Sequence, residues 1–215
     1  MEKTTAIQIL LCLALGYLLG CVSPSYIFGR VRGYDVRSSG SKNAGASNTV
    51  LMAGKFAGLA VALLDMAKAA AAWLLCAALC PELDIAPALG GAACVIGHMY
   101  PVFLRFHGGK GLACLGGVIL AYDPKTFLLM LLVALLIGLA SNYVCIVTVS
   151  MSLIFPAYYG YVTALWLGAA ILAVPAAPIF IKHIENFRRI KTGQELRLSF
   201  LWNKNRELRR IGYEE

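Results

Sequence analysis

Seven apolar stretches follow one another along the chain, and they limit its fold more than any other feature. They cover Ile7–Phe28, Leu51–Cys80, Ile85–Pro101, Leu112–Tyr122, Phe127–Ala140, Val144–Tyr158 and Val162–Ile181. A helix needs about 20 mostly apolar residues to cross the roughly 30 Å of hydrocarbon in a bilayer. Hydrophobic residues make up 60% of the 215 positions and charged residues only 14%, which excludes soluble and disordered classes. We predict an all-α integral membrane protein with seven transmembrane helices, some short or broken.

The basic residues are unevenly divided between the two sides of this arrangement. With the N-terminus outside and alternating spans, all 19 Lys and Arg residues except Lys3, Lys68 and Lys125 fall in segments on the inner side. Such a bias marks the cytoplasmic side. We therefore expect an outside N-terminus and a cytoplasmic C-terminus. Residues 1–200 are predicted to form one transmembrane domain, and residues 201–215 a basic cytoplasmic tail that lies on anionic lipid as an amphipathic helix.

Several kinds of site are not indicated. The net charge of +8 follows from the topology, so no nucleic-acid partner is expected. The sequence has neither the spacing of a Walker A loop nor GxGxxG, so nucleotide binding is unsupported. No cofactor and no metal are expected, because the seven cysteines form no CxxC pair and are interpreted as small buried hydrophobes. They are Cys12, Cys21, Cys76, Cys80, Cys94, Cys114 and Cys145.

Three polar clusters, at residues 37–48, 107–111 and 183–195, all face the cytoplasm in the predicted topology. A Gly/Ser/Asn run is usually a turn, and a basic run beside the membrane is usually a topology anchor or a lipid contact. However, glycine-rich backbone leading into a helix exposes amide N–H groups that suit phosphate oxygens. Lys110 lies in such a loop, where it can place a positive charge on an anion. Three such clusters on one side favour phosphate binding.

In the third cluster, polar side chains recur at helical spacing. His183 and Asn186 are three residues apart and share one face if the segment is helical, and Arg189 extends that face.

Ionisable residues also occur inside the predicted spans. Asp65 and Lys68 lie three apart in the second span, where they can pair. Ionisable groups at membrane depth are rare and are usually paired or functional. The two residues are therefore either a structural ion pair or part of the wall of a polar cavity. His98 is expected to be a hydrogen-bonded core histidine.

Six motifs follow one another along the predicted spans, at residues 20–25, 35–48, 65–68, 97–103, 106–111 and 183–186. In this order they resemble the bacterial acyl-phosphate:glycerol-3-phosphate acyltransferase family over nearly the whole chain. The resemblance implies a seven-helix membrane enzyme of the bacterial cytoplasmic membrane, with its active site at the cytoplasmic face. It also implies acyl transfer from acyl phosphate to the 1-hydroxyl of sn-glycerol 3-phosphate, with membrane lipid as surroundings and a monomer favoured.

The resemblance further implies which residues form the site. Catalytic roles fall to Lys110, His183, Asn186 and Ser41, and phosphate binding to Asn43, Gly45, Asn48, Gly108, Gly109 and Gly111. Supporting positions are Asp65, Lys68, His107 and Cys145. The family is thought to use substrate assistance without a covalent acyl-enzyme. The sequence agrees with this, since it contains neither a GxSxG elbow nor a His-x4-Asp pattern.

The chain departs from the family pattern at a few positions. Leu51 stands where the family usually has Arg, His107 where it has Lys, and Cys145 where it has Ser. A second interpretation therefore keeps acyl phosphate as donor but takes a different acceptor. A third is a transporter of phosphorylated solutes, although the two halves of the chain show no internal repeat of the kind such transporters have.

Overall fold

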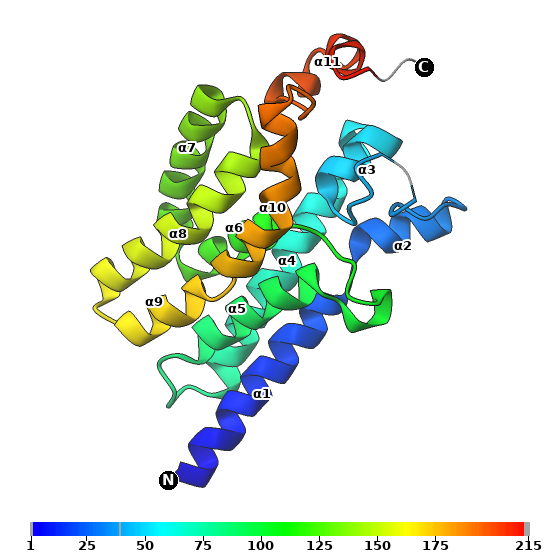
Figure 1. The fold of residues 1–215 in the computed structure, drawn as a ribbon. Coiled ribbons are helices and arrows are strands. Elements are labelled where there is room, and N and C mark those ends of the chain that lie inside the picture. Colours follow the sequence, from blue (N-terminus) through cyan, green and yellow to red (C-terminus); the bar gives the residue numbers. More distant parts are fainter. Residues whose placement is uncertain (1, 39, 213–215) are drawn as a thin grey trace.

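The computed structural model describes residues 2–38 and 40–212, and every regular element in that part of the chain is a helix (Figure 1). The α-helices are α1 Glu2–Cys21, α2 Pro24–Val31, α3 Ala46–Ala53, α4 Lys55–Leu79, α5 Ala86–Met99, α6 Leu112–Tyr122, α7 Pro124–Ser141, α8 Val144–Thr163, α9 Trp166–Ala173, α10 Ala176–Lys191 and α11 Lys204–Arg210. Two 3-10 turns, η1 Val102–Leu104 and η2 Leu198–Leu201, complete the order.

Local sequence signals set several helix boundaries. Ser23 caps α2 by accepting a hydrogen bond from the amide of Tyr26, and Asp123 caps α7 by accepting one from the amide of Thr126. Proline follows each cap at the first helical position, where its missing N–H costs nothing. At the other end of α7, Asn142 adopts the left-handed conformation that commonly ends helices.

Within residues 2–38 and 40–212, six segments are long and apolar enough to cross a membrane, and α6 is a shorter apolar helix. At 1.5 Å per residue, the eleven residues of α6 rise only about 16 Å, roughly half of the hydrocarbon core. The predicted boundaries were wrong at three junctions. The span predicted over Ile7–Phe28 is broken after α1, and Leu51 belongs to α3 rather than α4. Gly54, at a φ of 88°, separates those two helices. The span predicted over Val162–Ile181 begins inside α8 and is interrupted between α9 and α10.

Helix α5 is the most buried span and lies among α1, α4 and α9. Its contact with α1 depends on glycine at several positions. A Cβ on Gly16 or Gly20 would overlap a carbonyl oxygen of α5, and a Cβ on Gly97 would overlap the carbonyl oxygen of Tyr17. Small residues let helix backbones approach closely in membranes, so these glycines fix α5 at the centre of the molecule.

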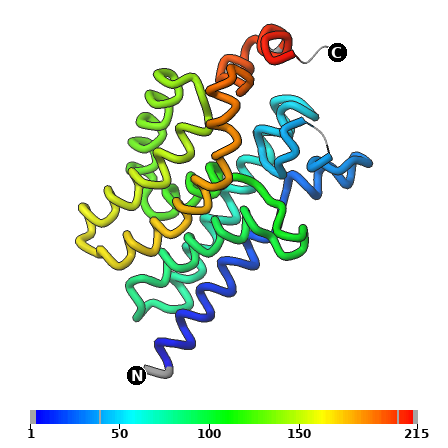
Figure 2. The backbone as a smooth tube through the Cα atoms, viewed as in Figure 1, coloured from blue at the N-terminus to red at the C-terminus, as the bar shows by residue number. Residues whose placement is uncertain are grey.

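The first and last described helices lie at opposite ends of the molecule. Helix α1 starts at one end, whereas α3, the C-terminal end of α10, and α11 lie toward the other (Figures 1 and 2). The polar clusters before α3 and at the end of α10 are thus on the same side.

Candidate active site

A cavity of about 810 Å³ lies where the loops before α3 and α6 meet α10. At one end its lining is polar, and we call this region the polar end. It is formed by Ser41, Asn43, Lys110, His183, Asn186, Arg189 and Glu195. Residues that are more than 70 positions apart in the sequence therefore share one space.

The remainder of the cavity is apolar and extends between the spans. Helices α4, α6, α7 and α8 provide its walls, mainly through Met66, Leu115, Ile119, Phe127, Met130, Leu131, Val147 and Met151. We call this region the apolar arm. A cavity with a polar end and an apolar arm suits a ligand that joins an anion to a hydrocarbon chain.

Two side chains of α10 face the polar end. His183 and Asn186 are 2% and 6% exposed and lie one helical turn apart, as their spacing predicts. The Nδ1 of His183 donates a hydrogen bond to the carbonyl oxygen of Ile179 at 2.7 Å. This bond orients the imidazole and leaves Nε2 for a ligand.

A hydrogen-bonded chain connects Lys110 to the segment after α10. Lys110 Nζ donates to Asn186 Oδ1 at 2.5 Å, and Asn186 Nδ2 donates to Glu195 Oε1 at 2.6 Å. The other carboxylate oxygen of Glu195 accepts from Arg189 Nε at 2.9 Å. Burial lowers the pKa of Lys110, and the nearby Arg189 lowers it further, while Glu195 acts in the opposite direction. An anion at this position would restore the charged form of the amine.

Asn48, in the first turn of α3, holds the polar loop at residues 37–45 in place through hydrogen bonds. Its Nδ2 donates to the carbonyl oxygen of Val36 at 2.6 Å, and its Oδ1 accepts from the amide of Ser41 at 2.8 Å. Asn48 is fully buried and does not line the cavity. Asn48 thus shapes the loop that presents Ser41 and Asn43, and its predicted role in phosphate binding stays a prediction.

Two helix starts also line the cavity. Gly45 and Gly111 precede α3 and α6, and both line the cavity together with the first residues of their helices. The first amides of a helix have no intrahelical acceptor and carry partial positive charge. A Cβ on Gly45 would lie 3.8 Å from the Cα of Gly109, so the two loops are adjacent.

The remaining loop glycines pack against the end of α5, and their predicted role in phosphate binding stays a prediction. The amides of Gly108 and Gly109 donate to carbonyl oxygens at the end of α5, at 3.2 and 3.0 Å, and not toward the cavity. A Cβ on Gly109 would overlap the His98 ring. His107, predicted as a supporting residue, is exposed, and its ring donates to the carbonyl oxygen of Arg105. The loop glycines thus allow the loop to pack closely, which leaves Lys110 and Gly111 at the cavity.

Asp65, Lys68 and His98 form a buried charged cluster beside this loop. Asp65 Oδ1 lies 2.8 Å from Lys68 Nζ and 3.2 Å from His98 Nδ1. Lys68 also donates to two carbonyl oxygens near the end of α1, at 3.0 and 2.6 Å. Asp65 and His98 line the cavity, whereas Lys68 lies behind them. Both sequence-based interpretations of the Asp65–Lys68 pair therefore hold in part.

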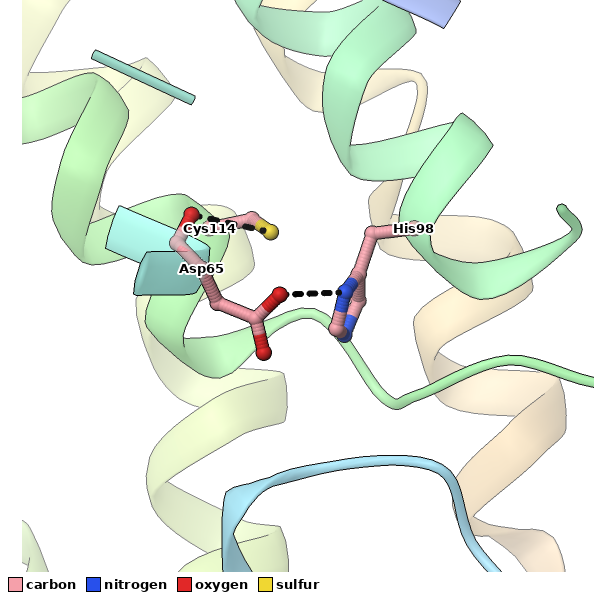
Figure 3. A group of neighbouring side chains, drawn as sticks. All are labelled: Asp65, His98 and Cys114. Atoms are coloured by element: carbon pink, nitrogen blue, oxygen red, sulfur yellow. Dashed lines mark hydrogen bonds and ion pairs between the residues drawn. The ribbon is translucent and has the colours of Figure 1, made fainter. Parts of the chain in front are cut away.

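The same cluster has the residue types of a metal site. Ligand atoms of Asp65, His98 and Cys114 lie within 4.8 Å of one another (Figure 3). However, the Cys114 thiol donates to the backbone carbonyl of Asp65 at 3.5 Å, and the Lys68 ammonium is 3.1 Å from His98 Nδ1. Because a lysine cation already faces both the carboxylate and the imidazole, the donor set fits an ion pair and not a metal.

The sequence assigned no role to Glu195, although it lies in the third polar cluster, and none in the site to the residues that follow it. Glu195 contacts Asn186 and Arg189, and the cavity lining also includes Phe200, Leu208 and Ile211. An isolated glutamate and a short basic helix carry no recognisable motif. Cys145, predicted as a supporting residue, does line the cavity.

Comparison with known proteins decides the family. The model of the family described as glycerol-3-phosphate acyltransferase matches residues 10–193. The chain belongs to this family. It is 36% identical to glycerol-3-phosphate acyltransferase 1 of Oceanobacillus iheyensis, over 88% of this chain and 95% of that protein. It is 38% identical to the enzyme of Geobacillus kaustophilus, over 84% and 91% of the two chains.

A solved structure agrees with the fold of this acyltransferase. The crystal structure of PlsY, an integral membrane glycerol 3-phosphate acyltransferase in its glycerol 3-phosphate form, is 32% identical. It superposes with a TM-score of 0.78 over 92% of this chain and 98% of that one. A lysophosphatidic acid form of PlsY matches with a TM-score of 0.77. The predicted class, an all-helical integral membrane acyltransferase, is confirmed.

Proposed function

We propose that this enzyme transfers a fatty acyl group from acyl phosphate to the 1-hydroxyl of sn-glycerol 3-phosphate, giving lysophosphatidic acid and inorganic phosphate. The observation that carries the proposal is the convergence of Lys110, His183 and Asn186 at one end of a cavity whose other end is apolar. One end suits phosphate groups and the other a hydrocarbon chain. The family membership and the glycerol 3-phosphate form of PlsY support the acceptor.

The reaction needs little covalent help from the protein. The acceptor oxygen bonds to the acyl carbon, the bond from that carbon to the phosphate oxygen breaks, and the hydroxyl proton passes to a phosphate oxygen. An acyl phosphate is an activated anhydride, so positioning and charge stabilisation can supply most of the catalysis. We therefore propose substrate assistance, in which a substrate phosphate accepts the proton and no acyl-enzyme forms.

The residues at the polar end take separate parts in this scheme. Lys110 neutralises the phosphate that leaves, and the amides at the starts of α3 and α6 bind phosphate oxygens. Asn186 and His183 Nε2 orient the acceptor. Ser41 and Asn43 close the polar end from the side of the first loop.

The proposal also covers the membrane orientation and oligomeric state of the enzyme. We propose that the polar end faces the cytoplasm from the bacterial inner membrane and that the enzyme works as a monomer. The bias of Lys and Arg supports this orientation, as do the opposite positions of the start of α1 and α11. The acyl chain of the donor would enter the apolar arm from the lipid.

An assay with defined donors tests the proposal. Purified enzyme in detergent should release phosphate from palmitoyl phosphate when glycerol 3-phosphate is present, and should produce lysophosphatidic acid in equal amount. Acyl-CoA and acyl carrier protein should not replace the donor. Cys145→Ser should retain turnover, because no thioester forms at that thiol. Activity with acyl-CoA, or loss of activity in Cys145→Ser, would contradict the proposed chemistry.

One observation favours a second candidate, an enzyme with the same donor and a different acceptor. Leu51, which replaces the arginine usual in the family, lines the cavity, so the departure lies within the site. Leu51→Arg would add a guanidinium suited to phosphate. If glycerol 3-phosphate is the acceptor, this variant should lower its KM. An unchanged or raised KM, together with higher turnover on an unphosphorylated alcohol, would favour the second candidate.

A further inference from the structure

The segment after α10 folds back on the rest of the protein instead of lying apart from it. The amide of Leu198 donates to the carbonyl oxygen of Asn142 at 2.7 Å, and the amide of Ser199 to its Oδ1 at 3.3 Å. Asn142 is the residue that ends α7. Residues 198–211, which we call the strap, therefore extend from the α7–α8 turn across the end of α10.

An ion pair within the strap fixes its internal structure. Glu207 is 5% exposed and accepts from Ser199 Oγ at 3.0 Å and from Arg210 Nε at 2.9 Å. Burial alone would raise the pKa of Glu207, but these two hydrogen bonds outweigh it and the pKa is lowered. A buried carboxylate held by both partners keeps its charge and fixes the orientation of Arg210.

The two terminal nitrogens of the Arg210 guanidinium bind the loop that carries Glu195. Its Nη1 donates to the carbonyl oxygen of Gly193, and its Nη2 donates to that of Glu195 at 2.5 Å. The Glu195 side chain in turn accepts from Asn186 and Arg189. Arg210 is therefore connected to Lys110 through Glu195 and Asn186, although it does not line the cavity itself.

The strap also contributes apolar lining. The cavity wall includes Phe200 from η2, Leu208 from α11 and Ile211 just after it. The family model ends at residue 193, so these side chains and Arg210 lie outside the part of the chain that defines the family.

We propose that the strap completes the active site, with Arg210 as a positioning residue that holds Asn186 and Lys110 in place through Glu195. This inference rests on the proposed function for its kinetic consequences. Removing Arg210 should release the Glu195 loop, so that Asn186 and Lys110 lose their alignment with the acceptor.

Kinetics test the proposal with matched variants of the full chain. Arg210→Ala should lower kcat/KM for glycerol 3-phosphate at least tenfold, and Arg210→Lys should recover only part of the loss, because an ammonium cannot copy the planar fork. Arg209→Ala, on the exposed side of the same helix, should behave as the parent. In the double variant Arg210→Ala/Asn186→Ala, activity should fall no more than about twofold below Asn186→Ala alone, because both changes act on one unit.

Hydrogen exchange tests the same contact without any turnover. The amides of Gln194 and Glu195 donate to the carbonyl oxygen of Arg189 at 2.8 and 3.1 Å. They should exchange faster in Arg210→Ala than in the parent, and at the parental rate in Arg209→Ala.

Each outcome bears on one proposal. Unchanged exchange in Arg210→Ala, or losses that simply multiply in the double variant, would overturn the positioning role. If the parent shows no acyl-phosphate-dependent turnover, the proposed function fails, and exchange still decides whether Arg210 holds the loop.

Discussion

Replacing Lys110 with methionine removes the amine at the polar end while keeping a stem of similar length. The amine lies 2.5 Å from Asn186 Oδ1 at the cavity wall. A hydrogen bond to a charged group contributes about 1.5–3 kcal/mol, and each 1.4 kcal/mol corresponds to about tenfold. Lys110→Met should therefore lower kcat/KM about 10- to 150-fold, measured as phosphate release from palmitoyl phosphate at varied glycerol 3-phosphate.

The matched control for that variant is Lys125→Met, because Lys125 is exposed and follows the start of α7. It should retain the parental rate, and both variants should unfold at similar temperatures in detergent. If Lys110→Met remains within about threefold of the parent, Lys110 is not the phosphate-binding cation and the assignment of the polar end is refuted.

Three further predictions concern pH and packing. Burial lowers the pKa of Lys110 below 10.5, so the KM for glycerol 3-phosphate should rise as the pH increases through that lowered pKa. Lys110→Arg should shift this rise to higher pH. Identical profiles of KM against pH in the parent and the variant would contradict the prediction. Gly109→Ala should lower the free energy of unfolding by about 1–3 kcal/mol, because the new Cβ would overlap the His98 ring. Gly138→Ala should leave the stability unchanged, because its Cβ would meet only ordinary contacts. Thermal unfolding of the two variants in detergent compares them. Lys68→Met should lower the free energy of unfolding by up to about 3–5 kcal/mol, because the buried Asp65 carboxylate loses its lysine partner. Asp65→Asn in that background should recover part of the loss, and an equal or greater loss in the double variant would count against the pair.

Much of the fold follows from the apolar stretches. Their order locates the long apolar helices α1, α4, α5, α7 and α8, because long apolar runs have few alternatives to a membrane span. The breaks were harder to predict. The turn at Gly54 lies inside one continuous apolar run, where α3 and α4 separate at a positive φ. Hydropathy averages over such single-residue turns, so the run was interpreted as one span.

The site was only partly predictable for a related reason. Side chains such as Lys110, His183 and Asn186 were recognisable because they interrupt apolar sequence with groups that need a partner or a ligand. The sequence marks Gly108 and Gly109 as loop positions that need glycine. A glycine can serve either to expose its amide to a ligand or to allow a close contact with a neighbouring group, and the sequence does not distinguish the two. Only the position of His98 under the loop shows that close packing applies here.

The charge balance at the polar end explains why glycine loops matter to this enzyme. Among the described residues that line it, Lys110 and Arg189 are positive and Glu195 is negative, while Asp65 is paired with Lys68. The side chains thus supply about one net positive charge, far less than the phosphates of a donor and an acceptor require. Each helix start contributes roughly half a charge, and the starts of α3 and α6 both face the cavity. In the proposed function, backbone amides at these helix starts would therefore carry part of the charge compensation. Gly45 and Gly111 would let the bare backbone approach the phosphate oxygens closely.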